Sequence, residues 1–295
     1  MATRYDLLLF FIHTLKSSIM KNIIVPTDFS ETAKNAYRYA LDLATHNGYQ
    51  LKVINVCHPG ATVADGLKVV EDYEVLMDIQ QKKLAHFVEL EDEDKAGNLS
   101  TMVQTEIVNG FAHDELVELS RLPSTEMILM GTTGSSNILN RWFGSVSTTV
   151  AQDAECPVWL VPPQSKYKGI KKILYAGNYE SANKEVMDKI IALSNQFNAE
   201  VQLLHVRESK GIDQEMEDAF LEDLFKKVAP SLEYVLHAAK LGTIEDTIYQ
   251  WAEDLEADLI VLVNKKHHFW EGLFNKSTTK AMILQAQMPL LVLHD

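Results

Sequence analysis

Cysteine and positive charge are both scarce in this sequence. The 295 residues include two cysteines, Cys57 and Cys156, which lie far apart and form no C-x-x-C pair. This usage excludes a disulfide framework and favours a reducing compartment, which predicts a cytoplasmic protein. The 27 lysine and arginine residues are outnumbered by 41 aspartate and glutamate residues, which leaves a net charge of −14. That balance argues against binding nucleic acid or an anionic membrane through bulk electrostatics.

Sequence features of membrane insertion and of catalysis are also missing. The apolar run Leu7–Ile12 is too short to span a bilayer, and no basic region or cleavage site of a signal peptide accompanies it. No G-x-G-x-x-G follows a predicted strand, and Phe274–Thr278 resembles only the tail of a P-loop because Asn275 replaces the required glycine. There is no nucleophile elbow and no kinase signature set. We therefore expect no membrane insertion, and we identify no catalytic residue and no metal ligand.

What the chain does contain is an internal repeat. Residues 23–56 align without gaps to residues 173–206, and the segment from Gly110 aligns to the segment from Gly242. In each copy, five apolar runs alternate with segments whose apolar residues recur at helical spacing. Strands that alternate with helices predict right-handed crossovers and a parallel sheet. The predicted fold is therefore α/β, with two tandem doubly wound domains of five strands each.

The repeat also sets the predicted domain boundaries. We assign residues 21–164 to the first domain and residues 169–295 to the second, with the proline- and lysine-containing segment 162–169 as the linker. Three interpretations stay open for residues 1–20, which precede the repeat: an upstream extension, a misassigned start, or an added amphipathic segment.

The first repeat carries a glycine-rich turn with distinctive spacing. Gly131 and Gly134 are followed, after nine residues, by Gly144 and Ser145. The turn follows the apolar run Met127–Met130, a predicted buried strand, and precedes a predicted helix that begins at Ser145. Backbone N–H groups of such a turn can converge on phosphate, with the positive end of the helix dipole behind them, and glycine lets the backbone approach. The pattern therefore predicts a phosphate-binding site.

Two further strand ends are expected near this turn. The first predicted strand ends in Pro26-Thr27-Asp28 and the second ends near Val56. If the first and fourth strands are neighbours where the winding reverses, these segments and the glycine turn share one crevice. The Asp28 carboxylate could then accept a hydrogen bond from ribose or adenine, and Val56 would offer an apolar wall and a backbone edge to a base. In the alternative interpretation, Asp28 or Ser30 simply caps the following helix.

These features resemble the universal stress protein family. Its nucleotide-binding branch carries G-x2-G-x9-G-[ST], which Gly131, Gly134, Gly144 and Ser145 fill here, and Pro26-Thr27-Asp28 resembles its first-strand signature. The resemblance covers both repeats, about residues 21–295. It implies a five-stranded parallel sheet flanked by helices, of the adenine nucleotide alpha hydrolase-like type, which often pairs into dimers. It also implies bound ATP, accompanied by Mg²⁺, with weak or no hydrolysis, and a role in stress survival. The implied nucleotide contacts are Pro26, Thr27, Asp28, Val56, Met130, Gly131, Thr133, Gly134, Gly144, Ser145, Val146 and Ser147.

The second repeat departs from this pattern. Asn178 replaces the aspartate, Val263, Lys266 and Lys276 stand at the glycine positions, and Ser277 remains. A branched side chain disfavours positive φ, and the lysine side chains occupy the space of a phosphate. We therefore predict one competent nucleotide site, in the first domain, with the second domain as an internal pseudo-dimer partner.

Three functions remain in competition at this point. The first is a regulatory module whose ATP occupancy changes a surface for an unidentified protein partner, in a chain that is a homo-dimer or an internal pseudo-dimer. The second is a slow ATPase or phosphotransferase, and the third is a dimerising scaffold that ignores nucleotide. The first glycine-rich loop contains no lysine and one arginine, Arg141. Because phosphoryl transfer depends on cationic stabilisation, efficient ATP hydrolysis is not expected.

Overall fold

The computed structural model describes residues 22–58, 63–64, 67–68, 73–92, 102–132, 145–177, 183–207, 219, 222–227, 229–240, 244–264 and 288–294. Residues 1–20, interpreted above as an extension, lie outside these ranges. Within the described ranges, no helix combines the length and the hydrophobicity needed to cross a bilayer.

Each repeat forms a five-stranded parallel sheet, as predicted. In both sheets the first and fourth strands are neighbours, and the strand order is the same, β5-β2-β1-β6-β7 and β10-β9-β8-β11-β12. The strands of the first domain are β1 (Asn22–Pro26), β2 (Gln50–Cys57), β5 (Val103–Asn109), β6 (Thr125–Gly131) and β7 (Val158–Val161). Those of the second are β8 (Lys172–Gly177), β9 (Glu200–Arg207), β10 (Tyr234–Lys240), β11 (Leu259–Asn264) and β12 (Leu290–His294). The short strands β3 (Val63–Ala64) and β4 (Leu67–Lys68) pair separately and antiparallel.

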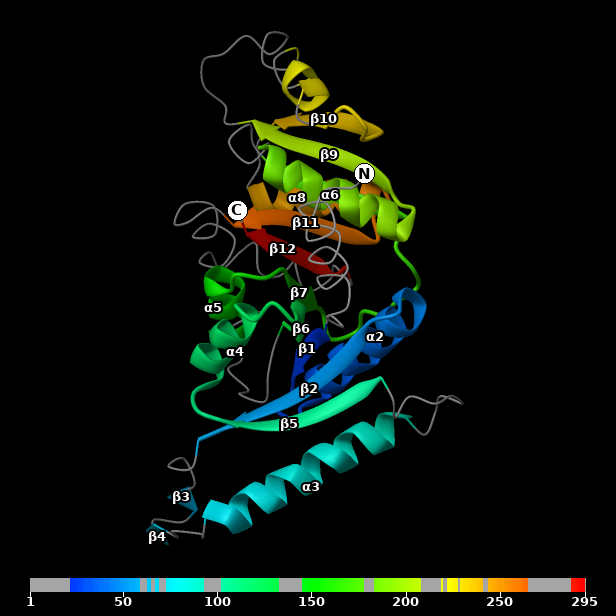
Figure 1. Ribbon diagram of the computed structural model, residues 1–295. Coiled ribbons are helices and arrows are strands. Elements are labelled where there is room, and N and C mark those ends of the chain that lie inside the picture. The colour runs from blue at the N-terminus through cyan, green and yellow to red at the C-terminus, as the bar shows by residue number, and fades with distance from the viewer. Residues whose placement is uncertain are drawn as a thin grey trace, which may run out of the picture.

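The two sheets join edge to edge into one sheet of ten strands (Figure 1). Strand β7 pairs antiparallel with β12, with Trp159 opposite Leu291 and Val158 opposite Val292. The other pairings described for this sheet are parallel. The two domains therefore pair through their fifth strands, which is the arrangement expected of an internal pseudo-dimer.

Helices cover both faces of the joined sheet. Helices α2 (Glu31–Asn47), α3 (Tyr73–Asp92) and α6 (Lys184–Phe197) contribute to one apolar core, and α4 (Ala112–Ser120), α5 (Ser145–Asp153) and α8 (Ile244–Asp254) contribute to the other. The repeat extends to the helix ends. Gly48 (φ 72°) and Asn198 (φ 51°) both take the left-handed conformation after α2 and α6, as their alignment predicted.

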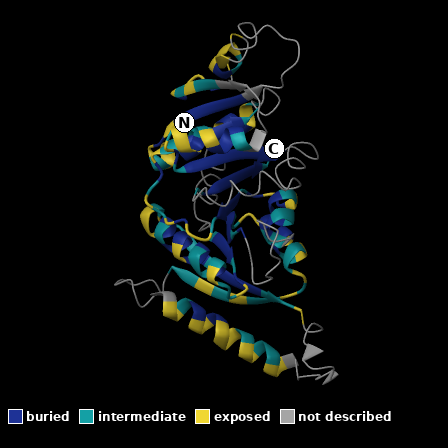
Figure 2. Ribbon diagram, turned by 180° about the vertical axis from the view of Figure 1, so that it is seen from behind, coloured by how far each residue is buried: buried dark blue, intermediate teal, exposed yellow. Residues whose placement is uncertain are grey.

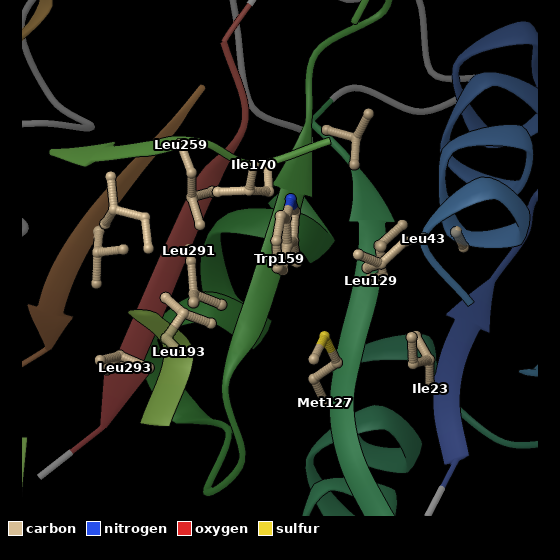
Figure 3. Close-up of a cluster of buried hydrophobic side chains, with 14 of the residues drawn as sticks. Ile23, Leu43, Met127, Leu129, Trp159, Ile170, Leu193, Leu259, Leu291 and Leu293 are labelled. Atoms are coloured by element: carbon tan, nitrogen blue, oxygen red, sulfur yellow. The ribbon is translucent and has the colours of Figure 1, made fainter. Parts of the chain in front are cut away.

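The first core continues across the domain boundary. Trp159 of β7 is fully buried and contacts Tyr39 of α2, with ring centroids 6.1 Å apart, and Phe197 of α6, at 6.2 Å. Figure 3 shows Trp159 between Leu129 of the first domain and Leu291 of the second. In Figure 2 the buried residues follow the strands, and exposed residues follow the outer faces of the helices. Burial of large apolar side chains from both domains therefore stabilises their contact.

The predicted linker lies against α2. The side-chain amide of Asn35 donates to the carbonyl oxygens of Pro162 and Ser165, both at 3.0 Å. The ring of Tyr167 packs edge-on against Tyr39, with centroids 5.4 Å apart. These contacts hold the linker on the first domain, so the connection between the domains is not a free tether.

Candidate functional site

The crevice predicted between the first and fourth strands has its framework in the first domain. Strand β1 pairs with β6, with Ile23 opposite Met127 and Ile24 opposite Ile128. Strand β2 lies beyond β1 and β7 lies beyond β6, so the winding reverses between β1 and β6. The carboxyl ends of these two strands are Pro26 and Gly131, which places the two predicted segments at one edge of the sheet.

A tight turn follows β1 and presents Asp28 at this edge. The Thr27 N–H donates to the carbonyl oxygen of Ile54 at 2.8 Å, and the Thr27 hydroxyl oxygen accepts from the Phe29 N–H at 3.0 Å. Phe29 takes a left-handed conformation, with φ of 65°. Asp28 is exposed, and its carboxylate accepts the Ser30 N–H at 3.0 Å.

Ser30, and not Asp28, caps helix α2. Its hydroxyl oxygen accepts the Ala33 N–H at 3.2 Å, the usual bond of an N-cap serine. The structure thereby decides between the two capping residues that the sequence left open. Asp28 precedes this N-cap by two residues and lies at the carboxyl edge of the sheet.

A buried amide that sequence reasoning missed fixes the end of β1. Asn55, in β2, is buried and donates from its side chain to the carbonyl oxygen of Thr27 at 2.8 Å. The aligned residue of the second repeat is His205, whose Nδ1 lies 3.3 Å from the carbonyl oxygen of Gly177. Both repeats thus tie the end of their first strand with a polar side chain from the second. The available signal was a polar residue within an apolar strand, Val53–Val56.

Gly131 is required by packing between β6 and α2. A Cβ at this position would lie 2.6 Å from the Thr32 Cγ2 atom and 3.1 Å from the Thr32 carbonyl oxygen. Among the described glycines, positive φ occurs at Gly48, Gly110 and Gly169, so Gly131 is not a left-handed turn residue. The close approach of α2 therefore explains this glycine without any ligand, alongside its predicted role in phosphate binding.

The start of α5 is tied to the end of β6. The Ser147 hydroxyl donates to the Thr132 carbonyl oxygen at 3.0 Å, and the Thr132 N–H donates to the Val161 carbonyl oxygen at 3.2 Å. Helix α5 begins at Ser145, as the sequence predicted. The first turn of α5 is thus held beside the strand ends, where its N–H groups lack partners within the helix.

Of the remaining predicted contact residues, some lie in or against the core and others lie outside the described residues. Met130 is buried in the core, and half-buried Val56 and Val146 pack against it. Thr133, Gly134 and Gly144 lie outside the described residues. The structure therefore brings Pro26, Thr27, Asp28, Gly131 and the start of α5 to one edge, and the full set of predicted contacts stays a prediction.

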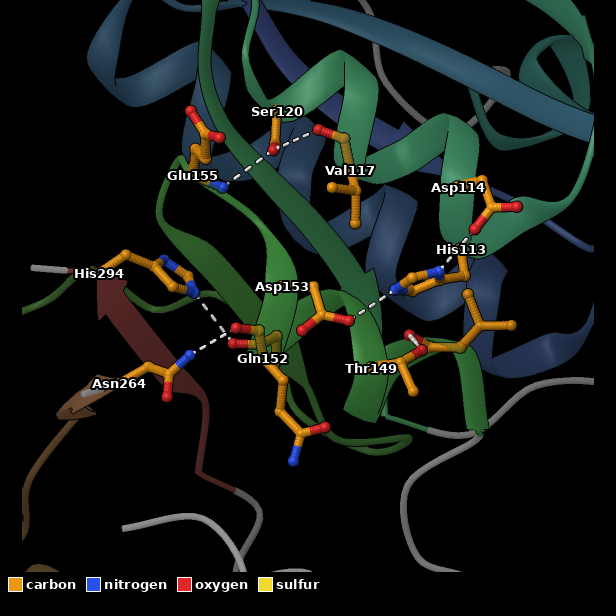
Figure 4. A network of polar contacts seen from close by, with 12 residues as sticks. His113, Asp114, Val117, Ser120, Thr149, Gln152, Asp153, Glu155, Asn264 and His294 are labelled. Atoms are coloured by element: carbon orange, nitrogen blue, oxygen red, sulfur yellow. Dashed lines mark hydrogen bonds and ion pairs between the residues drawn. The ribbon is translucent and has the colours of Figure 1, made fainter. Parts of the chain in front are cut away.

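The far end of α5 contacts the second domain (Figure 4). The Asn264 side chain, at the end of β11, donates to the Gln152 carbonyl oxygen at 2.6 Å. The His294 Nε2 atom lies 3.0 Å from the Ala151 carbonyl oxygen. Carbonyl groups in the last turn of a helix lack partners within the helix, and here side chains of the other domain supply them. Helix α5 therefore runs from the candidate site to the strand ends of the second domain.

A cavity of about 380 Å³ lies elsewhere, between the linker and the second domain. Its lining includes Lys166 and Lys168 of the linker and Glu253 and Asp258 of the second domain. Opposite charges share this lining, so it offers no selective attraction for a triphosphate. The strand edge at Asp28 and Gly131 remains the better candidate.

The fold defines a class: a tandem doubly wound α/β protein in which the first and fourth strands of each half meet where the winding reverses. The family model of the universal stress protein family matches residues 20–162 and 169–294. The chain belongs to the universal stress protein family.

Relatives of known sequence and structure agree with this assignment. Universal stress protein MJ0531 of Methanocaldococcus jannaschii is 26% identical over 149 residues, which are 50% of this chain and 86% of that protein. Universal stress protein Rv2624c of Mycobacterium tuberculosis is 30% identical over 139 residues, 47% of each chain. The crystal structure of a universal stress protein from Archaeoglobus fulgidus is 18% identical, has a TM-score of 0.66, and is matched over 93% of this chain and 96% of that one.

Proposed function

We propose that this chain is an ATP-binding regulatory module with one nucleotide site, at the carboxyl ends of β1 and β6 in the first domain. The observation that carries the proposal is the meeting of the Asp28 turn and the start of α5 at a reversal of the sheet winding. The exposed Asp28 carboxylate suits a ribose or adenine donor, and the N–H groups at the start of α5 suit phosphate.

Mg²⁺ would be held mainly by the phosphates and by water. In the part of the chain that the structure describes, no three His, Cys, Asp or Glu side chains gather closely enough to hold a metal ion. Asp28 is the one predicted site residue with a carboxylate, and Mg²⁺ commonly binds through phosphates with few protein ligands. With little cationic support in the site, we expect binding without efficient hydrolysis.

The second domain acts in this proposal as a structural partner. Its strand β12 completes the joined sheet, and Asn264 and His294 at its strand ends bond to the carbonyl groups of α5. The loss of aspartate and glycine at its aligned positions favours one site per chain. A cytoplasmic location, an additional protein partner and pairing of whole chains into dimers stay predictions.

Titration calorimetry of Mg-ATP into the nucleotide-stripped full chain tests the proposal. We expect one ATP per chain, and a marked loss of affinity in Asp28→Ala. The matched control is Asn178→Ala, which alters the aligned position of the second repeat and should leave the affinity unchanged. Two ATP per chain would contradict the single site. An absence of binding at several temperatures would instead favour the scaffold that ignores nucleotide.

A further inference from the structure

Two aromatic rings stack at the surface beside the candidate site. The rings of His58 and Phe111 have centroids 4.5 Å apart and planes inclined by 25°. Phe111 is 62% exposed, the largest fraction among the big apolar side chains of the described ranges, and His58 is exposed as well. The pair is therefore outside both cores, and burial of apolar surface does not account for it.

The pair lies at the same edge of the sheet as Asp28. His58 directly follows β2, and Phe111 stands between β5 and α4. Strands β2 and β5 pair in parallel up to Cys57 and Asn109, and the Gly110 N–H donates to the Cys57 carbonyl oxygen at 3.1 Å. Figure 1 shows β2 and β5 ending side by side. Strand β2 is also the neighbour of β1, with Ile54 opposite Pro26, so His58 lies one strand spacing, about 5 Å, to the side of β1 and four residues, about 13 Å, beyond the level of Pro26.

Helix capping does not explain a phenylalanine at position 111. Phe111 is the N-cap of α4 and makes no side-chain capping bond, although serine, threonine, aspartate and asparagine are preferred there. The backbone beside it is nevertheless closely packed. A Cβ on the preceding Gly110 would lie 2.2 Å from a carboxylate oxygen of Glu115, and the Glu115 N–H donates to the Phe111 carbonyl oxygen at 3.0 Å. The ring is thus presented to solvent at the start of α4, where Glu115 packs closely on the backbone.

The aromatic pair occurs in the repeat that keeps the glycine motif. The residues aligned with His58 and Phe111 in the second repeat are Glu208 and Thr243. The second repeat therefore lacks the rings as well as the aspartate and the glycines. If the rings had a structural role common to both domains, both repeats would be expected to carry them.

We propose that His58 and Phe111 form a platform on which the base of the bound nucleotide stacks. The inference rests on the nucleotide site proposed above and adds the residues that bind its base. With ribose at Asp28 and the base extending past Val56, the base reaches the end of β2, where the platform begins. Aromatic rings stack on the face of any base, so the platform contributes affinity for nucleotides over free phosphate, with little choice between bases.

The test compares ATP affinities of full-length variants by titration calorimetry. Phe111→Ser removes the ring and supplies a preferred N-cap residue, so the variant should unfold at the same temperature as the wild type or higher. We expect its ATP affinity to fall by about 5- to 150-fold, the range for the loss of one stacked base, and that of His58→Ala to fall less. Phe111→Trp, which keeps an aromatic ring, should retain the wild-type affinity.

A matched control is Leu122→Ser, which removes an exposed apolar side chain at the other end of α4. It should bind ATP as the wild type does. If Phe111→Ser and His58→Ala also bind ATP with wild-type affinity, the platform is refuted and the nucleotide site stands. If the wild type binds no ATP, the proposed function fails, and the platform fails with it.

Discussion

Gly131→Ala is expected to destabilise the protein even when no nucleotide is present. The added methyl carbon would lie 2.6 Å from Thr32 Cγ2 and 3.1 Å from the Thr32 carbonyl oxygen, so α2 or its side chain must shift. Thr32 is β-branched and sits in the first turn of α2, which limits its freedom to rotate away. Overpacking of this kind costs about 1–3 kcal/mol, and each kcal/mol lowers the melting temperature by roughly 2–4 °C in a domain of this size.

Scanning calorimetry of the nucleotide-stripped chain measures this loss, and a double-mutant cycle with Thr32→Ala assigns its cause. Removing Cγ2 relieves the shorter contact, so the double variant should recover most of the stability lost in Gly131→Ala. The control is Gly48→Ala, where nothing lies within 4 Å of the added carbon but φ is +72°. Its cost of about 1 kcal/mol comes from backbone strain and should not change with Thr32→Ala. If Gly131→Ala is as stable as the wild type and loses only ATP binding, the packing explanation is refuted.

Two more predictions concern titratable groups. His113 of α4 bonds to Asp114, its neighbour in the same helix, and to Asp153 of α5, each at 2.8 Å (Figure 4), and these hydrogen bonds, that of Asp114 first, raise its pKa above the ordinary 6.5. The stabilisation of the folded state by these bonds is fully present below the pKa of unfolded His113 and is lost as pH rises through the folded pKa. In urea unfolding, His113→Gln should therefore lower the free energy of unfolding at about pH 5.5, and this loss should shrink by about pH 8. A loss that does not change with pH would contradict this explanation. Burial raises the pKa of Cys156 to about 12. A maleimide should therefore label Cys57 in the native chain and Cys156 only after unfolding, and rapid labelling of both thiols in the native chain would contradict this prediction.

Much of the fold could be predicted because the chain repeats itself. Alignment of Gly48 with Asn198 predicted the same left-handed helix end twice, and both residues adopt it. The pairing of β7 with β12 could not be predicted, because an apolar strand does not show which strand covers its edge or in which direction. A difference in pattern was nevertheless present. Edge strand β5 mixes half-buried residues with exposed polar ones, whereas every residue of Val158–Val161 is apolar and buried.

The candidate site was less predictable than the fold. The sequence could place Asp28 and Gly131 at one edge because each stands at or just after the end of a recognisable strand, and the parallel topology brings such ends together. Asn55 was missed because its bond to Thr27 depends on the register between two strands, which local patterns do not encode. The contact of Gly131 with Thr32 was missed for the same reason, since it depends on how closely α2 packs on β6.

The joined sheet also has a consequence for how the two halves can vary. In a dimer of separate chains, both subunits carry the same sequence, so a substitution in one loop appears in both. In the fused chain, Val158–Val161 and Leu290–His294 can keep their paired edge while the second repeat carries Val263, Lys266 and Lys276 at its glycine positions. The linker holds the halves at an effective concentration on the order of millimolar, whatever the dilution. One half can therefore lose a ligand and still keep its place in the sheet.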